Sequence, residues 1–254
     1  MDPITQQAIF AAAGAGGGGL DVDDVFSVDL WAGSSNSVTV TNGLDLSGEG
    51  GLAWLKCRST TRMHPWFNSE RGTDKRLRSD TSGDESQQSA SGTLTFNNNG
   101  LTIPAGDGDI NASGFGNYVG WFFRKAPEFF DIVTYSGNGT AGRTVAHNLG
   151  SVPGMIILKS TSDSEQWFVY HRSLGASKWL RLQISDGVQS GSLAWNDTAP
   201  TSTAFSLHSY DGVNGSGKEY VAFLFGHDDA GIINCGTYTG VSQGSTLTVD
   251  CGFT

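Results

Sequence analysis

The residues best suited by type to bind a ligand are a histidine, a tryptophan and an arginine close together: His64, Trp66 and Arg71. An aromatic ring beside a basic side chain can stack on a sugar while the base hydrogen-bonds the sugar hydroxyls. The same residue types recur at residues 167–172. This duplication favours a different role, in which the tryptophans fill a core and the arginines bind loop carbonyls. The sequence leaves both the glycan contact and the buried structural cluster open.

A calcium site is suggested by three closely spaced oxygen ligands, Asp107, Asp109 and Asn111. The segment lacks the extended loop and the bidentate glutamate of an EF-hand. The matching segment in the second half of the chain, residues 209–214, keeps only one aspartate and one asparagine. This difference favours a solvated turn over a metal site.

No spacing of residues in the chain predicts an enzyme. Ser206 and His208 lie close together but lack the sharp turn that exposes a nucleophile. The glycines of residues 14–19 follow a helix-like segment and not a strand, which excludes a dinucleotide-binding fingerprint. The acidic residues form no recognisable pair of glycosidase carboxylates. We therefore predict no catalytic residue and no cofactor, with a glycan-cleaving enzyme as the alternative.

The elements that would position these residues are strands. Residues 118–123 and 220–225 are uninterrupted runs of β-branched and aromatic residues, which suit strands buried on both faces. The 36 glycines and abundant Ser, Thr and Asn indicate short strands joined by tight turns. We predict an all-β fold of tandem β-sandwiches, jelly-roll or concanavalin-like, in which six to eight strands form each module. The charged residues 69–78 and 81–89 are expected to be solvated loops.

The chain contains an internal repeat at offsets between 101 and 104 positions. Besides the two closing strands, Trp66-Phe67 matches Trp167-Phe168. Further matches join residues 29–33 with 133–137 and 236–240, and residues 52–56 with 155–159. Such a constant offset indicates a tandem duplication of one module.

The repeat divides the chain into four parts. We predict an anchor and tether at residues 1–24, β-sandwich modules at residues 25–128 and 129–230, and the start of an incomplete third module at residues 231–254. A single hairpin, such as residues 231–254 would form, is at best marginally stable alone. Either the chain is cut short, or this piece pairs with the second module or with a neighbouring chain.

The first residues differ from the rest of the chain. Asp2 and Pro3 form a strong helix start, because aspartate can cap free amides and proline is tolerated at the first helical position. Ile4, Ile9 and Phe10 give the short helix an apolar surface, and a glycine-rich stretch follows it. A helix this short needs a packing partner. We interpret residues 1–19 as an anchor for another protein, with a frayed terminus as the alternative.

The overall charge limits the classes of partner. The 15 basic and 25 acidic residues give a formal net charge of −10, which argues against nucleic-acid binding. The sequence shows no secretion signal and no apolar run long enough to cross a membrane. The three cysteines form no Cys-x-x-Cys pair, so we expect them to be reduced.

Residues 144–153 read Thr-Val-Ala-His-Asn-Leu-Gly-Ser-Val-Pro. This segment resembles one that recurs in bacteriophage tail-fibre and other tail-associated proteins. The surrounding modules resemble an uncharacterised repeated domain of virion structural proteins of marine phages, and their outline is similar to concanavalin-like and SPRY-like sandwiches. The residues that carry this second resemblance are 26–31, 48–56, 118–127 and 220–225. It covers residues 25–254 and carries over no catalytic residue.

The resemblance implies a virion structural protein of the phage tail, made in the host cytoplasm. It would be a tail fibre or a fibre bound to a neck or tail adaptor. Residues 1–19 would dock on other tail or neck proteins, and the β modules would project for assembly or host attachment. Host-surface glycan or protein is the implied ligand, and a homotrimer the implied assembly. The competing hypotheses are a phage depolymerase that cleaves host glycan and a non-viral adhesin, against which the missing secretion signal counts.

Overall fold

The computed structural model describes residues 20–88, 92–227 and 232–250. The predicted all-β class is confirmed, because every sheet is antiparallel and helix is nearly absent from these residues. The helices that they contain are the 3-10 turn η1 (Val22–Asp24) and the four-residue α2 (Asp211–Asn214). No helix of the described residues is long and apolar enough to span a bilayer.

The first copy of the repeat (residues 25–128) folds into two facing sheets. Its larger sheet has the strand order β1-β9-β3-β4-β5-β6 and its smaller sheet the order β2-β8-β7. Leu55, Phe67 and Phe122 of the larger sheet pack against Leu101 and Ile103 of the smaller one. The strands are β1 Phe26–Ala32, β2 Val38–Thr41, β3 Gly51–Cys57, β4 Pro65–Asn68, β5 Gly72–Arg78, β6 Ser86–Gln87, β7 Thr95–Asn97, β8 Gly100–Ile103 and β9 Asn117–Arg124.

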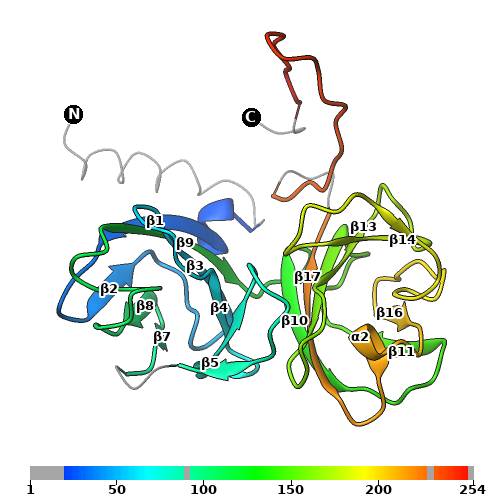
Figure 1. Ribbon diagram of the computed structural model, residues 1–254, viewed down its shortest axis with the longest axis horizontal. Coiled ribbons are helices and arrows are strands. Elements are labelled where there is room, and N and C mark those ends of the chain that lie inside the picture. The colour runs from blue at the N-terminus through cyan, green and yellow to red at the C-terminus, as the bar shows by residue number, and fades with distance from the viewer. Residues whose placement is uncertain (1–19, 89–91, 228–231, 251–254) are drawn as a thin grey trace.

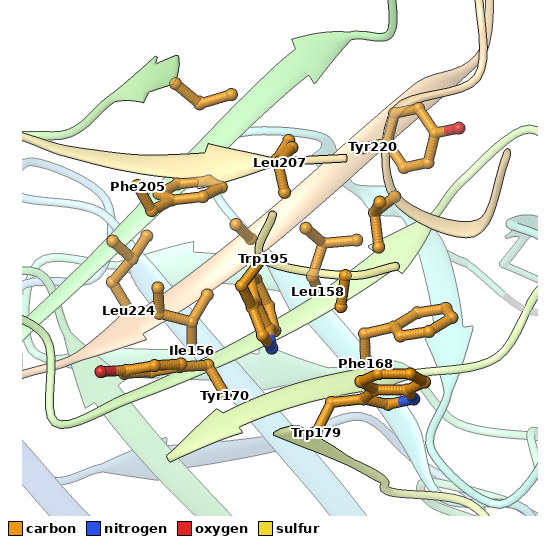
Figure 2. Close-up of a cluster of buried hydrophobic side chains, with 14 of the residues drawn as sticks. Ile156, Leu158, Phe168, Tyr170, Trp179, Trp195, Phe205, Leu207, Tyr220 and Leu224 are labelled. Atoms are coloured by element: carbon orange, nitrogen blue, oxygen red, sulfur yellow. The ribbon is translucent and has the colours of Figure 1, made fainter. Parts of the chain in front are cut away.

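The second copy (residues 129–230) repeats this arrangement. Its larger sheet has the order β10-β17-β12-β13-β14-β15, in which each strand corresponds to its counterpart in the first copy, and β11 pairs with β16. A core rich in aromatic and aliphatic side chains, including Trp195, Phe205 and Tyr220, fills the space between the sheets (Figure 2). The strands are β10 Phe130–Ser136, β11 Arg143–Ala146, β12 Met155–Ser160, β13 Phe168–His171, β14 Lys178–Arg181, β15 Gln189–Ser190, β16 Ala204–Leu207 and β17 Glu219–Phe225.

The two copies lie side by side, and their large sheets pack against each other through a third core (Figure 1). Successive side chains of a strand point to opposite faces of its sheet. Phe67 therefore lies in the core of its own copy, whereas Trp66 points toward the other copy. We call this third cluster the interface core. Its buried members are Val25, Leu52, Trp66, Leu77, Ala126, Phe129, Phe130, Ile132, Ile157, Trp167, Val169, Val221, Phe223 and Phe225.

The expectation that residues 69–78 form a solvated loop is wrong. Most of this segment is strand β5, and Leu77 is fully buried in the interface core. The charged side chains of the segment are neutralised by acids nearby: Arg76 pairs with Asp107 at 3.0 Å, and Arg71 pairs with Glu85. In this part of the chain, the presence of charged residues therefore did not indicate exposure to solvent.

Residues 232–250 contain no strand, and beyond Cys235, whose backbone donates to His227 Nδ1 at 3.0 Å, they run away from the second copy (Figure 1). Ile232 and Ile233 still pack against the interface core. Tyr135 stacks on Tyr220 of its closing strand, but the matching Tyr238 is 69% exposed. Within the described residues, no closing strand lies beside Tyr238.

Candidate functional site

The outer face of strands β1, β9 and β3 carries an uncovered patch of side chains. The strand register aligns Leu30, Val119 and Lys56 in one row across the three strands. The next row joins Val28, Trp121 and Trp54. We call these six residues the open face. A third row, beginning at Phe26, lies beyond them and packs into the interface core.

The open face borders a broad, shallow cavity of about 840 Å³. Leu30 is 63% exposed and Val28 is 48% exposed, although both are apolar residues in a strand. Trp121 is half-buried and lines the cavity together with Lys56 and the loop of residues 58–61. Exposed apolar side chains that gather in one place mark binding sites more often than isolated ones do.

In the second copy the corresponding rows are covered. Val221 and Lys159 occupy the positions of Val119 and Lys56, and all but one residue of the two rows are buried. The ring of Trp66 lies 4.9 Å from the ring of Phe223, which stands where the first copy has Trp121. These two rows are thus buried at the interface in the second copy, with the exception of Thr134, whereas in the first copy only Trp54 of the six residues packs against the interface core.

The first copy, which covers this face of the second copy, also places charged groups near Lys159. The Lys159 ammonium is fully buried and donates to the carbonyl oxygens of Ser160 at 2.6 Å and Asp163 at 3.1 Å. Burial lowers the pKa of Lys159 to about 8, while the carboxylates of Glu165 and Asp84 oppose this shift. Asp84 and Arg71 both belong to the first copy, and their charges act in opposite directions on the pKa of Lys159.

The open copy has positive charge at the equivalent place and no acid. Lys56 and Arg58 line the cavity, and no aspartate or glutamate does. Within the described residues neither of the two cations forms an ion pair. The Lys56 ammonium has a distant contact, 3.5 Å, with the carbonyl oxygen of Arg62. In a chain with net charge −10 this is a local positive site.

The predicted glycan contact falls in a different environment. Trp66 is 1% exposed and packs against Trp167, with their ring centroids 5.2 Å apart, so its ring offers no face to a sugar. Arg71 pairs with Glu85 and donates to the carbonyl oxygen of Trp66 at 3.3 Å. His64 is half-buried, and burial lowers its pKa. Trp66 and Arg71 thus have the buried structural surroundings that the duplication favoured, whereas His64 is partly exposed.

The residues proposed for calcium belong to a buried polar network. Asp107 accepts hydrogen bonds from Arg76 at 3.0 Å and from Gln88 at 2.9 Å. Asp109 lies 3.5 Å from the same guanidinium group. The segment is therefore not a solvated turn. Across the described parts of the chain, no three His, Cys, Asp or Glu side chains gather in a way that could hold a metal ion.

Asn111 has a structural role that the second copy repeats. Its amide donates to the carbonyl oxygen of Asn36 at 2.9 Å, and its oxygen accepts from the backbone of Ser34 at 2.8 Å. Asn214 occupies the same place and binds the backbone of Asn138 at 3.0 Å and the carbonyl oxygen of Thr140 at 3.0 Å. In each copy, these hydrogen bonds join the turn after the first strand (β1 or β10) to the segment before the last strand (β9 or β17).

The predicted anchor residues Asp2, Pro3, Ile4, Ile9 and Phe10 lie outside the described residues, as does Cys251. The cysteines that the structure describes, Cys57 and Cys235, are free thiols.

The open face was missed by reasoning from the sequence. Its residues come from three strands and a loop and form no motif along the chain. A comparison of the copies carries a weak signal, since Trp121 replaces Phe223 and Leu30 replaces Thr134 at matching positions. Tryptophan and leucine at partly solvated positions would have marked the first copy as different.

Comparison with known proteins supplies a family. A family model described as a domain of unknown function, DUF7483, matches residues 21–254. This match spans both copies and the residues that follow them. No curated protein and no solved structure matches the chain. The chain therefore belongs to the DUF7483 family.

Proposed function

We propose that this protein is a structural component of a bacteriophage particle, associated with the tail, that presents β modules for assembly or host-surface attachment. The observation that carries the proposal is the open face: an apolar and basic surface on a module held rigidly to its neighbour. A binding surface of this kind fits a scaffold that makes contacts and performs no chemistry. The resemblance of the modules to a repeated domain of phage virion proteins supports the same assignment.

The rigidity of the module pair supports a projecting element. Relative motion of modules is the default unless their interface is large and hydrophobic. Here the interface core joins both large sheets, and the Trp167 indole donates to the carbonyl oxygens of Arg78 at 3.1 Å and Thr81 at 3.0 Å across it. A further bond joins the backbones of Glu85 and Thr161 at 3.0 Å. Such a pair transmits force as one unit.

The remaining parts of the proposal rest on sequence. Residues 1–19 dock on another tail or neck protein, and symmetric assembly, a trimer, covers exposed sheet edges such as that of β1. Several weak contacts made together then give avidity for the host surface. Each sandwich is of the concanavalin-like or jelly-roll kind.

Purified particles provide the test. Mass spectrometry and immunogold labelling of intact particles should find the protein in the tail, and a chain lacking residues 1–19 should fold but fail to be incorporated. Absence of the full chain from purified particles would refute the assignment. Release of reducing ends from host envelope polysaccharide, abolished by one acidic substitution, would establish the depolymerase instead.

A further inference from the structure

We propose that the open face binds an acidic saccharide, with the Trp121 indole stacked on the sugar ring and Lys56 and Arg58 paired with its carboxylate. The inference rests on the proposed function, for which it names the ligand class of the host-attachment surface.

The size of the cavity fits one or two sugar units. Its volume of about 840 Å³ lies within the roughly 300–1,000 Å³ that is typical of small-ligand sites. It is open along one side, so a longer chain can continue into solvent. Phe123, in the row beyond, packs on Phe130 and Phe225 of the neighbouring copy, which limits the free area to two rows.

The residues that line the cavity suit both the apolar C–H groups and the hydroxyls of a sugar. One face of a pyranose ring carries C–H groups, which pack on an aromatic ring and on aliphatic side chains such as Leu30 and Val119. The cavity is also lined by Ser59, Thr60 and Thr61, which are exposed residues whose hydroxyls can donate to or accept from sugar hydroxyls.

The charge selects an acidic sugar over a neutral one. Lys56 and Arg58 come close to the cavity without an acid beside them. Arg62, which follows in the same loop region, lies over the ring of Phe115 at 3.9 Å and adds to the positive potential. A carboxylate placed there makes charge-assisted hydrogen bonds, which are about twice as strong as neutral ones.

The covered copy shows what this face accepts. There the first copy places the Trp66 ring edge-on against Phe223, with 72° between the ring planes, so this face packs against an apolar ring. The open copy presents an aromatic ring and a lysine in the same register. An acidic sugar supplies a flat apolar ring face and a carboxylate together.

The test uses the full chain and three acidic hexasaccharides: oligomers of galacturonic acid, mannuronic acid and sialic acid. Calorimetric titration at physiological ionic strength should detect at least one of them, and a neutral galactose hexamer should bind about tenfold more weakly or not at all. Failure of all three acidic probes, or equal binding of the neutral one, would overturn the inference.

Variants then locate the site. The double change Lys56→Gln with Arg58→Gln should weaken acidic-sugar binding about tenfold or more. Trp121→Ala should abolish it, whereas Trp121→Phe should retain part of it. Lys178→Gln removes one exposed lysine of the second copy and controls for the loss of positive charge elsewhere on the surface. Circular dichroism must show each variant folded; binding unchanged in the double variant would place the ligand elsewhere.

The possible failures are distinguishable. If the protein is present in particles but binds no acidic saccharide, the tail assignment stands and the ligand class is wrong. A partner protein captured by the open face in assembled particles would indicate the same. If acidic saccharides bind but particles lack the protein, the site stands without the assignment.

Discussion

Trp66 and Trp167 occupy equivalent positions in the two copies, and their rings contact each other with centroids 5.2 Å apart. Their surroundings nevertheless differ. The Trp167 nitrogen donates to the carbonyl oxygens of Arg78 and Thr81 in the first copy. The Trp66 nitrogen is buried with no hydrogen-bond partner among the described residues. The interface thus joins like residues but is asymmetric, because one loop of the first copy folds over the second copy without a reciprocal contact.

This asymmetry predicts unequal effects of the same substitution. Trp66→Phe and Trp167→Phe remove equal volumes from the interface core. Only Trp167→Phe leaves two carbonyl groups without their donor, so it should destabilise the fold more, by about 1–2 kcal/mol. Urea unfolding monitored by circular dichroism measures the difference. Equal losses of stability would show that the two hydrogen bonds contribute nothing net.

The buried asparagines should be essential to the turns they hold. Asn111→Ala leaves the backbone groups of Ser34 and Asn36 without partners, and we expect a loss of about 2–3 kcal/mol. Asn214→Ala should cost a similar amount in the second copy. Asn117→Ala, at an exposed position, is the control and should change the unfolding midpoint little. If either buried variant behaved like the control, its network would not contribute to stability.

The lowered pKa of Lys159 predicts that the stability of the fold rises with pH. Its folded pKa of about 8 lies below the ordinary lysine pKa of 10.5, so between these values the unfolded chain binds more protons. The unfolding free energy should therefore increase as pH rises above about 8, and the penalty is fully present below that pH. In Lys159→Met this increase, on the order of 1–2 kcal/mol by about pH 9.5, should disappear. Parallel stability curves for both proteins would contradict the assignment.

The hydrogen bonds and the lowered pKa of His147 predict that the fold loses stability in acid. Its Nδ1 accepts from the backbone of Leu149 at 3.3 Å, which is possible only in the neutral ring, and its Nε2 then carries the proton and donates to the carbonyl oxygen of Thr201 at 3.2 Å. Burial lowers its pKa below the ordinary histidine pKa of 6.5. A base with a lowered folded pKa is destabilising once the unfolded chain protonates, so stability should fall as pH drops through about 6.5.

The replacement His147→Asn tests this origin. The asparagine oxygen can accept from Leu149 but does not titrate. The variant should lose less stability than the wild type between about pH 7 and pH 5, as thermal unfolding midpoints would show. An identical pH dependence in both proteins would assign the acid sensitivity to other groups, such as His64 or His171, whose pKa values burial also lowers.

The predictions that succeeded depended on local pattern. Residues 118–123 and 220–225 read as strands because β-branched and aromatic residues suit a pleated sheet, and both form central strands of their sheets. Residues 69–78 read as a loop because they are charged, and this was wrong because the acids that neutralise Arg71 and Arg76 lie far along the chain.

By itself the sequence determined the all-β class, the repeat and the alternation that sends Trp66 and Phe67 to opposite faces. Only the tertiary structure decided what covers each face. Side-chain alternation depends on neighbouring residues, whereas coverage depends on how two sheets that are about a hundred residues apart pack together. For that reason equivalent lysines, Lys56 and Lys159, have opposite environments: one lies beside an open cavity and the other is fully buried.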